Sequence, residues 1–255
     1  MPFVDKFIGL APVFVRLLGF FGIAPIFGGK RLPATFTVLL ALTLTAALAP
    51  VVGGGGLSAE TGTSALVTCI IGEALLGLLL GFMVQLVFSG FGLAGQITGL
   101  QLGFGIVTLF DPGSESQDSA FGQFYQLAAV LFLLLTDGHY MLIGALVRSF
   151  RAIPPGGIHW SEALGPILVT YSAKAIVLGV VIAAPVMAVM FLVNLGHGVL
   201  SRLFPQMNIF IVSMPVTIIV GFIVIISCLP LMGEMFGKGF SMSWEGIDAV
   251  LRALE

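Results

Sequence analysis

Six long apolar runs, separated by short polar or glycine- and proline-rich segments, dominate the chain. They cover residues 7–27, 34–52, 64–91, 121–147, 164–195 and 209–232. Because a helix needs ~20 apolar residues to cross a hydrocarbon core of ~30 Å, runs of this kind predict membrane-spanning helices. The pattern therefore predicts an all-α, polytopic helical membrane protein, and we expect a single domain over residues 1–255.

Turn-forming residues interrupt this pattern and predict broken helices and helical hairpins. Asp137-Gly138 lies inside the fourth run and predicts either a bent helix or the tip of a hairpin, while Pro205 ends the fifth helix. Residues 30–31 and 148–151 form two basic connections, and both favour the cytoplasmic side. Three apparent runs separate them, so either one run is not a full span or these helices do not end up in an ordinary bilayer. Both options suit a protein whose helices pack mainly on other proteins.

The chain is organised around the segment 94–118, whose first half has glycine at every fourth position. In a helix, Gly95, Gly99 and Gly103 fall on one narrow face where another backbone can approach closely. Gly77 and Gly81 repeat this spacing in the third run. We expect all five glycines to be helix-packing positions.

The second half of this segment predicts a loop. Asp111-Pro112-Gly113 has strong turn chemistry, and an apolar knob precedes it. The knob and its hinges comprise Gly105, Ile106, Val107, Thr108, Leu109, Phe110, Asp111, Pro112 and Gly113. Such a knob can fill a narrow constriction and exclude water, so we interpret the loop as a gate; the alternative is an ordinary connector between two spans.

Charged and polar side chains inside the apolar runs form a second set of candidates. We expect five to be buried: Arg16, Glu73, Lys174, Asn194 and His197. A charge at membrane depth costs about 3 kcal/mol, so Arg16 should face protein or water, and it is one candidate partner for Glu73. A structural ion pair that sets helix register is favoured over a proton relay.

Composition and missing motifs exclude several classes of function. At 58% hydrophobic and 9% charged residues, the chain has no basic patch with which to bind nucleic acid. Its sequence contains no phosphate-binding loop, zinc-protease motif, nucleophile elbow or cysteine–histidine cluster. We therefore predict no catalytic residue, metal ligand or cofactor, and we interpret Cys69 and Cys228 as small core residues.

Five segments resemble one known family in the same order along the chain. They are 16–27 (RLLGFFGIAPIF), 72–82 (GEALLGLLLGF), 95–112 (GQITGLQLGFGIVTLFDP), 137–154 and 200–210 (LSRLFPQMNIF). Together they resemble the FliR family of flagellar export-apparatus proteins, whose relatives also serve injectisome-type type III secretion systems. Asp137 departs from the neutral polar residue expected before Gly138-His139.

This resemblance implies a function beyond what composition shows. It implies a helical export gate, built with FliP- and FliQ-like subunits, that engages FlhB and FlhA and exports unfolded flagellar proteins. The gate belongs in the bacterial inner membrane, in contact with lipid, at the centre of the flagellar basal body. Residues 106–122 resemble the family's pore plug. The alternatives are an injectisome homologue, a secondary transporter of small solutes and a membrane scaffold without a pore.

Overall fold

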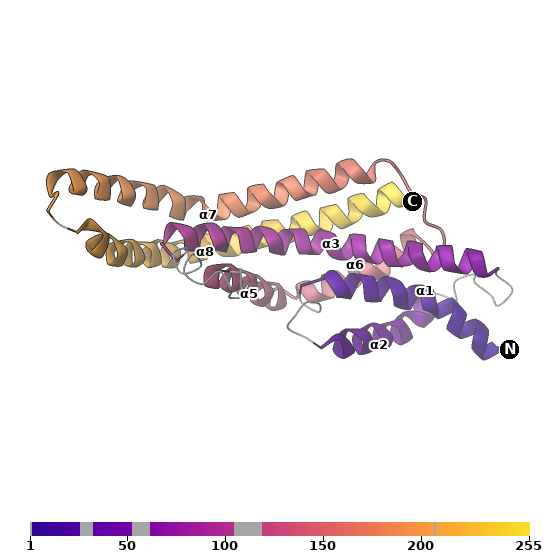
Figure 1. The fold of residues 1–255 in the computed structure, drawn as a ribbon. Coiled ribbons are helices and arrows are strands. Elements are labelled where there is room, and N and C mark those ends of the chain that lie inside the picture. The colour runs from indigo at the N-terminus through magenta and orange to yellow at the C-terminus, as the bar shows by residue number, and fades with distance from the viewer. Residues whose placement is uncertain (1, 26–32, 53–61, 105–118, 207) are drawn as a thin grey trace. The chain divides into compact units, whose positions relative to one another are not determined.

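The protein is almost entirely α-helical. The computed structural model describes residues 2–25, 33–52, 62–104, 119–206 and 208–255, and these contain no β-strand (Figure 1). The helices are α1 (Pro2–Ile23), α2 (Ala34–Val52), α3 (Thr63–Gln101), α5 (Ala120–Leu135), α6 (Gly138–Ala152), α7 (Leu164–Leu203) and α8 (Ile209–Leu254). Helices α3, α7 and α8 are long and apolar enough to cross a membrane. The prediction of an all-α, polytopic membrane protein is thus confirmed.

Some helices are longer than the apolar runs that predicted them. The third run and the glycine-rich segment form one helix of 39 residues, and the sixth run continues to Leu254. Proline residues do not stop these helices: Pro185 lies inside α7, and Pro215 and Pro230 lie inside α8. Each proline removes only one backbone hydrogen bond, which an apolar helix in protein or lipid surroundings tolerates. Pro205 does follow a helix end, because α7 stops at Leu203.

The fourth apolar run is a bent helix. Helices α5 and α6 meet at an angle of 77° across a short break. Asp137 adopts a left-handed conformation there, with φ 56°, and the backbone N–H of Tyr140 donates to its carbonyl. The two halves form at most one broken span, while α1 and α2 contribute only shorter apolar stretches, Gly9–Ile23 and Ala34–Pro50. These lengths are compatible with one of the two explanations for the basic connections, namely that one run is not a full span.

The described residues divide into two compact units. Unit 1 comprises Met1–Leu86, Leu133–Ser172 and Phe240–Glu255, and unit 2 comprises Val87–Phe132 and Ala173–Gly239. Helices α3, α5, α7 and α8 each contribute residues to both. The two units are groups of residues that contact one another and are not separate domains by this fact alone. The expectation of a single domain over residues 1–255 stays a prediction.

Each unit has its own buried core. In unit 1, α1 packs against α2, and α2 packs against α6. In unit 2, the rings of Phe91 and Phe236 meet edge-on with centroids 4.7 Å apart, and the ring of Phe132 lies tilted 5.7 Å from that of Phe236. Edge-to-face pairs of this kind add to the free energy gained by burying apolar area. Gly239 makes room for Phe91, since a β-carbon there would lie 2.7 Å from the ring.

Candidate functional site

Glycine residues bring three helix backbones of unit 2 into contact. A β-carbon added to Gly95 would collide with the carbonyl oxygen of Phe121 in α5. A β-carbon on Gly90 would lie 2.6 Å from the carbonyl oxygen of Ala175 in α7, and one on Gly179 would lie 2.7 Å from that of Gly90. Helix α3 therefore crosses α5 and α7 at distances that only glycine allows.

The other two glycines of the predicted face behave differently. An added β-carbon at Gly99 would make ordinary contact, 3.5 Å from the side chain of Phe121, and at Gly103 it would meet nothing within 4 Å. Gly103 therefore packs against no described part of this chain, and its predicted packing role stays a prediction. With φ 85°, Gly103 terminates α3 instead: its N–H donates to the carbonyl of Leu100, and the N–H of Phe104 donates to that of Gly99. This is a Schellman motif, which requires a left-handed residue.

The two ends of the predicted gate loop are held together. The rings of Phe104 and Phe121 lie 5.2 Å apart, and Phe121 also lies 6.1 Å from Phe222 in α8. Ser119 caps α5, because its hydroxyl accepts a hydrogen bond of 3.0 Å from the N–H of Gly122. The predicted knob and hinges, residues 105–113, lie outside the described residues.

An apolar cluster supports these loop anchors. Leu102, Val186, Met190 and Ile225 are buried together, and Phe121 packs against them. Gly221 is part of this arrangement, because any side chain there would collide with Leu102. The end of α3 is thus fixed by α7 and α8 immediately before the chain enters the loop.

In unit 1, Arg16 and Glu73 form the ion pair that the sequence suggested. Both side chains are fully buried. The guanidinium of Arg16 bridges both carboxylate oxygens, with Nη2 donating to Oε1 over 3.0 Å and Nε donating to Oε2. Paired geometry of this kind is the strongest arrangement available to these two groups.

Backbone groups complete this buried cluster. Arg16 donates through Nη1 to the carbonyl of Ser149 and through Nη2 to that of Ile153, each over 2.9 Å. Its guanidinium also lies 4.3 Å from the centre of the Phe150 ring. The backbone N–H of Gly156 donates to Glu73 over 3.1 Å. These bonds connect α1 and α3 to the carboxyl-terminal end of α6. The charges of Arg16 and Glu73 cancel and their polar groups have partners, as a structural role requires.

Glycine spacing explains why the two charges meet. Gly77 lies one helical turn after Glu73, and its missing side chain admits the backbone of Arg16 itself. Gly81 admits the carbonyl of Phe20, and Gly19 on α1 admits that of Ala74, with added β-carbons 2.7 and 2.9 Å away. The crossing of α1 and α3 therefore sets the register that places guanidinium against carboxylate.

Three of the predicted buried residues are not buried within this chain. Within the chain, Lys174 and Asn194 are exposed and His197 is only partly covered, and their burial in an assembly stays a prediction. Helix α7 packs through one face only, with Ala175, Gly179, Ile182 and others inward, so polar residues on its remaining faces stay at the surface of the chain.

Sequence reasoning missed several residues of these sites. Ser149 and Ile153 act through backbone carbonyls, for which a sequence has no signal. Gly90 lies five residues before Gly95, outside the four-residue spacing that drew attention to its neighbours. Among the described residues, no three His, Cys, Asp or Glu side chains gather in a way that could hold a metal ion.

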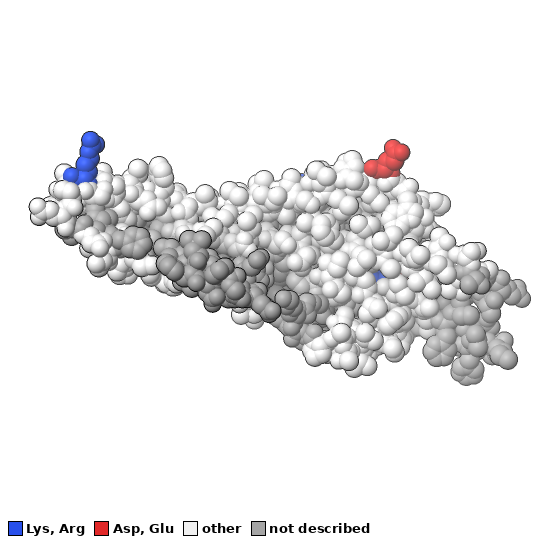
Figure 2. Space-filling model, viewed as in Figure 1, with Lys and Arg blue, Asp and Glu red and all other residues white. Residues whose placement is uncertain are grey.

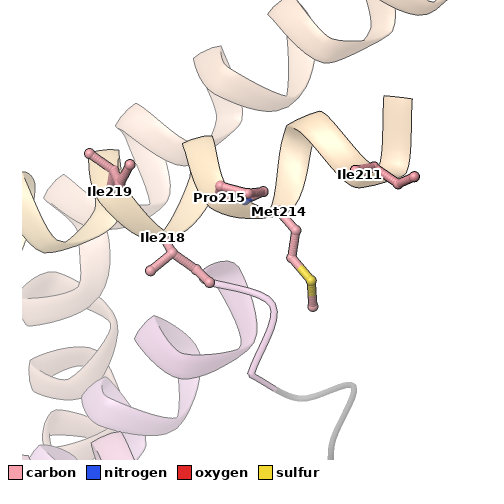
Figure 3. Close-up of a pocket in the computed structure, with 5 residues that line it drawn as sticks. All are labelled: Ile211, Met214, Pro215, Ile218 and Ile219. Atoms are coloured by element: carbon pink, nitrogen blue, oxygen red, sulfur yellow. The ribbon is translucent and has the colours of Figure 1, made fainter. Parts of the chain in front are cut away.

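The first turns of α8 carry an open apolar recess. Its lining comprises Ile211, Met214, Pro215, Ile218 and Ile219 (Figure 3). All five residues come from one helix, and Met214 and Ile218 project from the same side of it. Among the residues that the structure describes, only α8 lines this recess, so it is an open apolar surface.

Comparison with known proteins assigns the chain to a family. Residues 7–243 match the family described as bacterial export proteins, family 1. The flagellar biosynthetic protein FliR of Bacillus subtilis (strain 168) is 29% identical over 251 residues, which cover 97% of this chain and 96% of the relative. The FliR protein of Escherichia coli (strain K12) is 28% identical, over 89% of this chain and 86% of the relative. The FliR protein of Aquifex aeolicus (strain VF5) is 29% identical, over 86% of this chain and 84% of the relative. The chain therefore belongs to the bacterial export proteins, family 1, together with these FliR proteins.

Proposed function

We propose that the chain is a subunit of the flagellar type III export gate. It forms, with FliP- and FliQ-like subunits, a helical pore through which unfolded flagellar proteins leave the cell, and it engages FlhB and FlhA. Its place is the bacterial inner membrane at the flagellar basal body. Its role is structural rather than enzymatic. The family assignment supports the export apparatus, and the apolar surface of the helices supports assembly with other subunits.

The observation that carries this proposal is the length of exposed apolar surface on α7. Val169 and Leu203 are 70% and 64% exposed at opposite ends of this helix, and apolar residues between them are exposed as well. At 1.5 Å per residue, the helical segment between these two positions is about 51 Å long. A bilayer core of ~30 Å covers only about 39 Å of a helix, even at a tilt of about 40°. This length supports the proposal that neighbouring protein helices cover the rest.

The surface of the chain is suited to apolar protein neighbours. Figure 2 shows a face on which the described residues are almost entirely uncharged. The recess lined by residues 211–219 adds an indented apolar surface at the start of α8. Surfaces of this kind are typical of subunit interfaces and aggregate when left uncovered in water.

Residues 106–122 are proposed as the pore plug. Support comes from the two ends of the loop, where Phe104 and Phe121 pack together above a buried cluster. A loop held at a rigid base can move without separating helices, which costs less than opening the helix packing itself.

Copurification tests the assembly. We expect the tagged chain to copurify from membranes with coexpressed FliP- and FliQ-like subunits and to be poorly stable without them. A monodisperse, thermally stable monomer that binds neither subunit contradicts the proposal. Solute uptake by the chain purified alone would instead favour a transporter.

Deletion of residues 107–116 tests the plug. We expect the complex to assemble but to leak ions and small solutes, as measured by membrane permeability in cells that coexpress the partner subunits. Deletion of residues 53–56, a run of four glycines in another connection, is the matched control and should leave the membrane tight. If the assembled 107–116 deletion is as tight as wild type, the loop is a connector.

A further inference from the structure

A groove of about 580 Å³ lies between α6 and the carboxyl-terminal part of α8, within unit 1. The residues that line it include Met141, Gly144, Arg148 and Arg151 on α6 and Trp244 and Asp248 on α8. The groove lies outside the buried cluster of Arg16 and Glu73 and outside the loop anchors of unit 2, so neither arrangement explains it.

The lining of the groove follows the spacing along which helices pack on one another. On α6, positions 141, 144, 148 and 151 are three, four and three residues apart, as along the contact seam of a packed helix. On α8, positions 244 and 248 are four residues apart and share one face. Because both seams border the same groove, a third helix can pack on α6 and α8 together.

The side chains along the groove have the chemistry of a protein interface. Methionine, tryptophan and arginine are enriched where proteins bind one another, relative to the rest of a protein surface. Met141 is 58% exposed. A β-carbon added to Gly144 would meet no atom within 4 Å, so there is space beside Met141 for a large apolar side chain from outside the chain.

The positive charge of the groove is only partly neutralised. Arg148 Nη1 lies 3.6 Å from Asp248 Oδ1, and the two side chains are 55% and 41% exposed, so this ion pair is weak. Arg151 has no hydrogen bond or ion pair among the described residues, which leaves two cations against one anion. The complement of this lining is one carboxylate. Asp248 repels an occupant that carries only negative charge, such as free phosphate, whereas a helix can place a carboxylate at Arg151 and a neutral side chain beside Asp248.

The backbone that carries the two arginines is held in place from the inside. Arg16 donates to the carbonyls of Ser149 and Ile153, and the hydroxyl of Ser149 donates over 2.7 Å to the carbonyl of Leu146. The last turns of α6 are therefore ordered before a partner binds, which lowers the entropic cost of binding.

We propose that this groove binds an amphipathic helix of another subunit of the export apparatus. A large apolar side chain of that helix packs against Met141 and Gly144, and an aspartate or glutamate of the same helix pairs with Arg148 and Arg151. The apolar pair and the arginine pair are seven residues apart on α6, a distance of about 10 Å. The carboxylate of the docked helix therefore lies about two turns from its apolar anchor. The identity of the partner as an export-apparatus subunit rests on the proposed function.

Site-specific crosslinking tests this contact in the assembled complex. The full-length chain carries the photoreactive residue benzoylphenylalanine in place of Met141 and is coexpressed with the other subunits of a flagellar export apparatus. We expect one crosslinked partner peptide, identified by mass spectrometry, with an aspartate or glutamate about two helical turns from the crosslinked residue. The control places benzoylphenylalanine at Gly165, which is equally open but does not line the groove, and should not give this peptide.

Charge reversal tests the ion pair. Arg148→Glu/Arg151→Glu should lower the yield of the crosslinked peptide about tenfold or more, because like charges then face each other. Replacement of the partner's acidic residue by lysine should restore the yield in this variant and lower it in the unaltered chain. Arg252→Glu, an exposed arginine of α8 outside the lining, should leave the yield unchanged. If the arginines only stabilised the carboxyl-terminal end of α6, the lysine in the partner would restore nothing.

A steric variant tests the apolar half of the groove. Gly144→Leu occupies the space meant for the partner's anchor and should lower the yield severalfold, while α6 stays intact because nothing lies within 4 Å of an added β-carbon. Gly165→Leu is the matched control and should have no effect.

Several outcomes overturn the proposal. A crosslink to lipid only, or to a peptide without an acidic residue at the stated spacing, excludes it, as does an unchanged yield in Arg148→Glu/Arg151→Glu. If this double variant fails to accumulate in membranes, Gly144→Leu decides, and an unchanged yield there excludes the docked helix. Partner subunits that copurify with the chain without giving the crosslink refute the groove and leave the export-gate proposal standing, whereas the absence of copurification contradicts both.

Discussion

Unit 1 and unit 2 are each stabilised internally, but by different kinds of contact. In unit 1, a buried guanidinium and carboxylate are satisfied by each other, by two backbone carbonyls and by one backbone N–H. In unit 2, the corresponding contacts are backbones that touch at Gly90, Gly95 and Gly179 and apolar side chains packed around Leu102. One unit depends on directional polar bonds, and the other depends on shape.

This difference predicts how the stability of each unit responds to amino-acid substitution. A polar network in an apolar interior fails as a whole, because removal of one member leaves the others buried and unpaired. A glycine crossing fails by degrees, since the cost grows with the size of the added side chain and with the ability of its neighbours to move. Unit 1 should therefore be the more sensitive to single polar substitutions, and unit 2 to added volume.

The largest expected effect is that of Arg16→Met. It leaves Glu73 buried without its partner, and we expect a loss of about 3–5 kcal/mol of unfolding free energy. The double variant Arg16→Met/Glu73→Met removes both charges and should recover part of this loss. Unfolding in mixed micelles, followed by circular dichroism, measures Arg16→Met, Glu73→Met and the double variant. A double variant whose loss equals the sum of the two single losses would show that the charges are not coupled.

Gly95→Ala tests the shape-dependent packing of unit 2. The added methyl group collides with the Phe121 carbonyl, and we expect a loss of about 1–3 kcal/mol. Gly99→Ala should cost less, because its methyl group makes ordinary contact. Gly237→Ala on α8 meets nothing within 4 Å and should be neutral or slightly stabilising, since alanine favours helix. Equal losses at Gly95 and Gly237 in the same unfolding measurement would refute the backbone crossing.

Gly103→Ala separates a conformational role from a packing role at the end of α3. A residue with a β-carbon at φ 85° costs about 1–2 kcal/mol, although nothing nearby blocks the added methyl group. Gly103→Asn should cost less, because asparagine tolerates left-handed backbone. Unfolding free energies of the two variants decide, and a neutral alanine variant would mean that α3 can end without the left-handed residue.

Asp137→Gly is expected to have the smallest effect, and it is a stabilising one. Glycine adopts the left-handed conformation at φ 56° more readily than aspartate, which should raise the unfolding free energy by about 0.5–1 kcal/mol. Asp137→Ala is the control and should be destabilising. If Asp137→Gly lowers stability, the aspartate side chain has a role at the bend of α5 and α6 beyond its backbone conformation.

Much of the fold followed from the sequence because apolar surroundings leave the backbone few choices. Long apolar runs must satisfy their own N–H and C=O groups, so they form helices wherever they pack. The burial of Arg16 and Glu73 was predictable for a related reason, since charges at such depth must find partners, and Gly77 and Gly81 marked the face on which they would meet. The family segments added the function that composition could not indicate.

Only the tertiary structure decided which neighbour each helix face meets and where. Glycine spacing identifies a face, but the crossing point depends on both helices. The spacing therefore did not indicate Gly90 and Gly179, or the helix-ending conformation of Gly103. We expected Lys174 to be buried because its sequence neighbours are apolar. Within this chain it is exposed, because α7 packs through one face only. Local sequence determines what a segment can bury, whereas the surface available to bury it against is a property of the packed helices together.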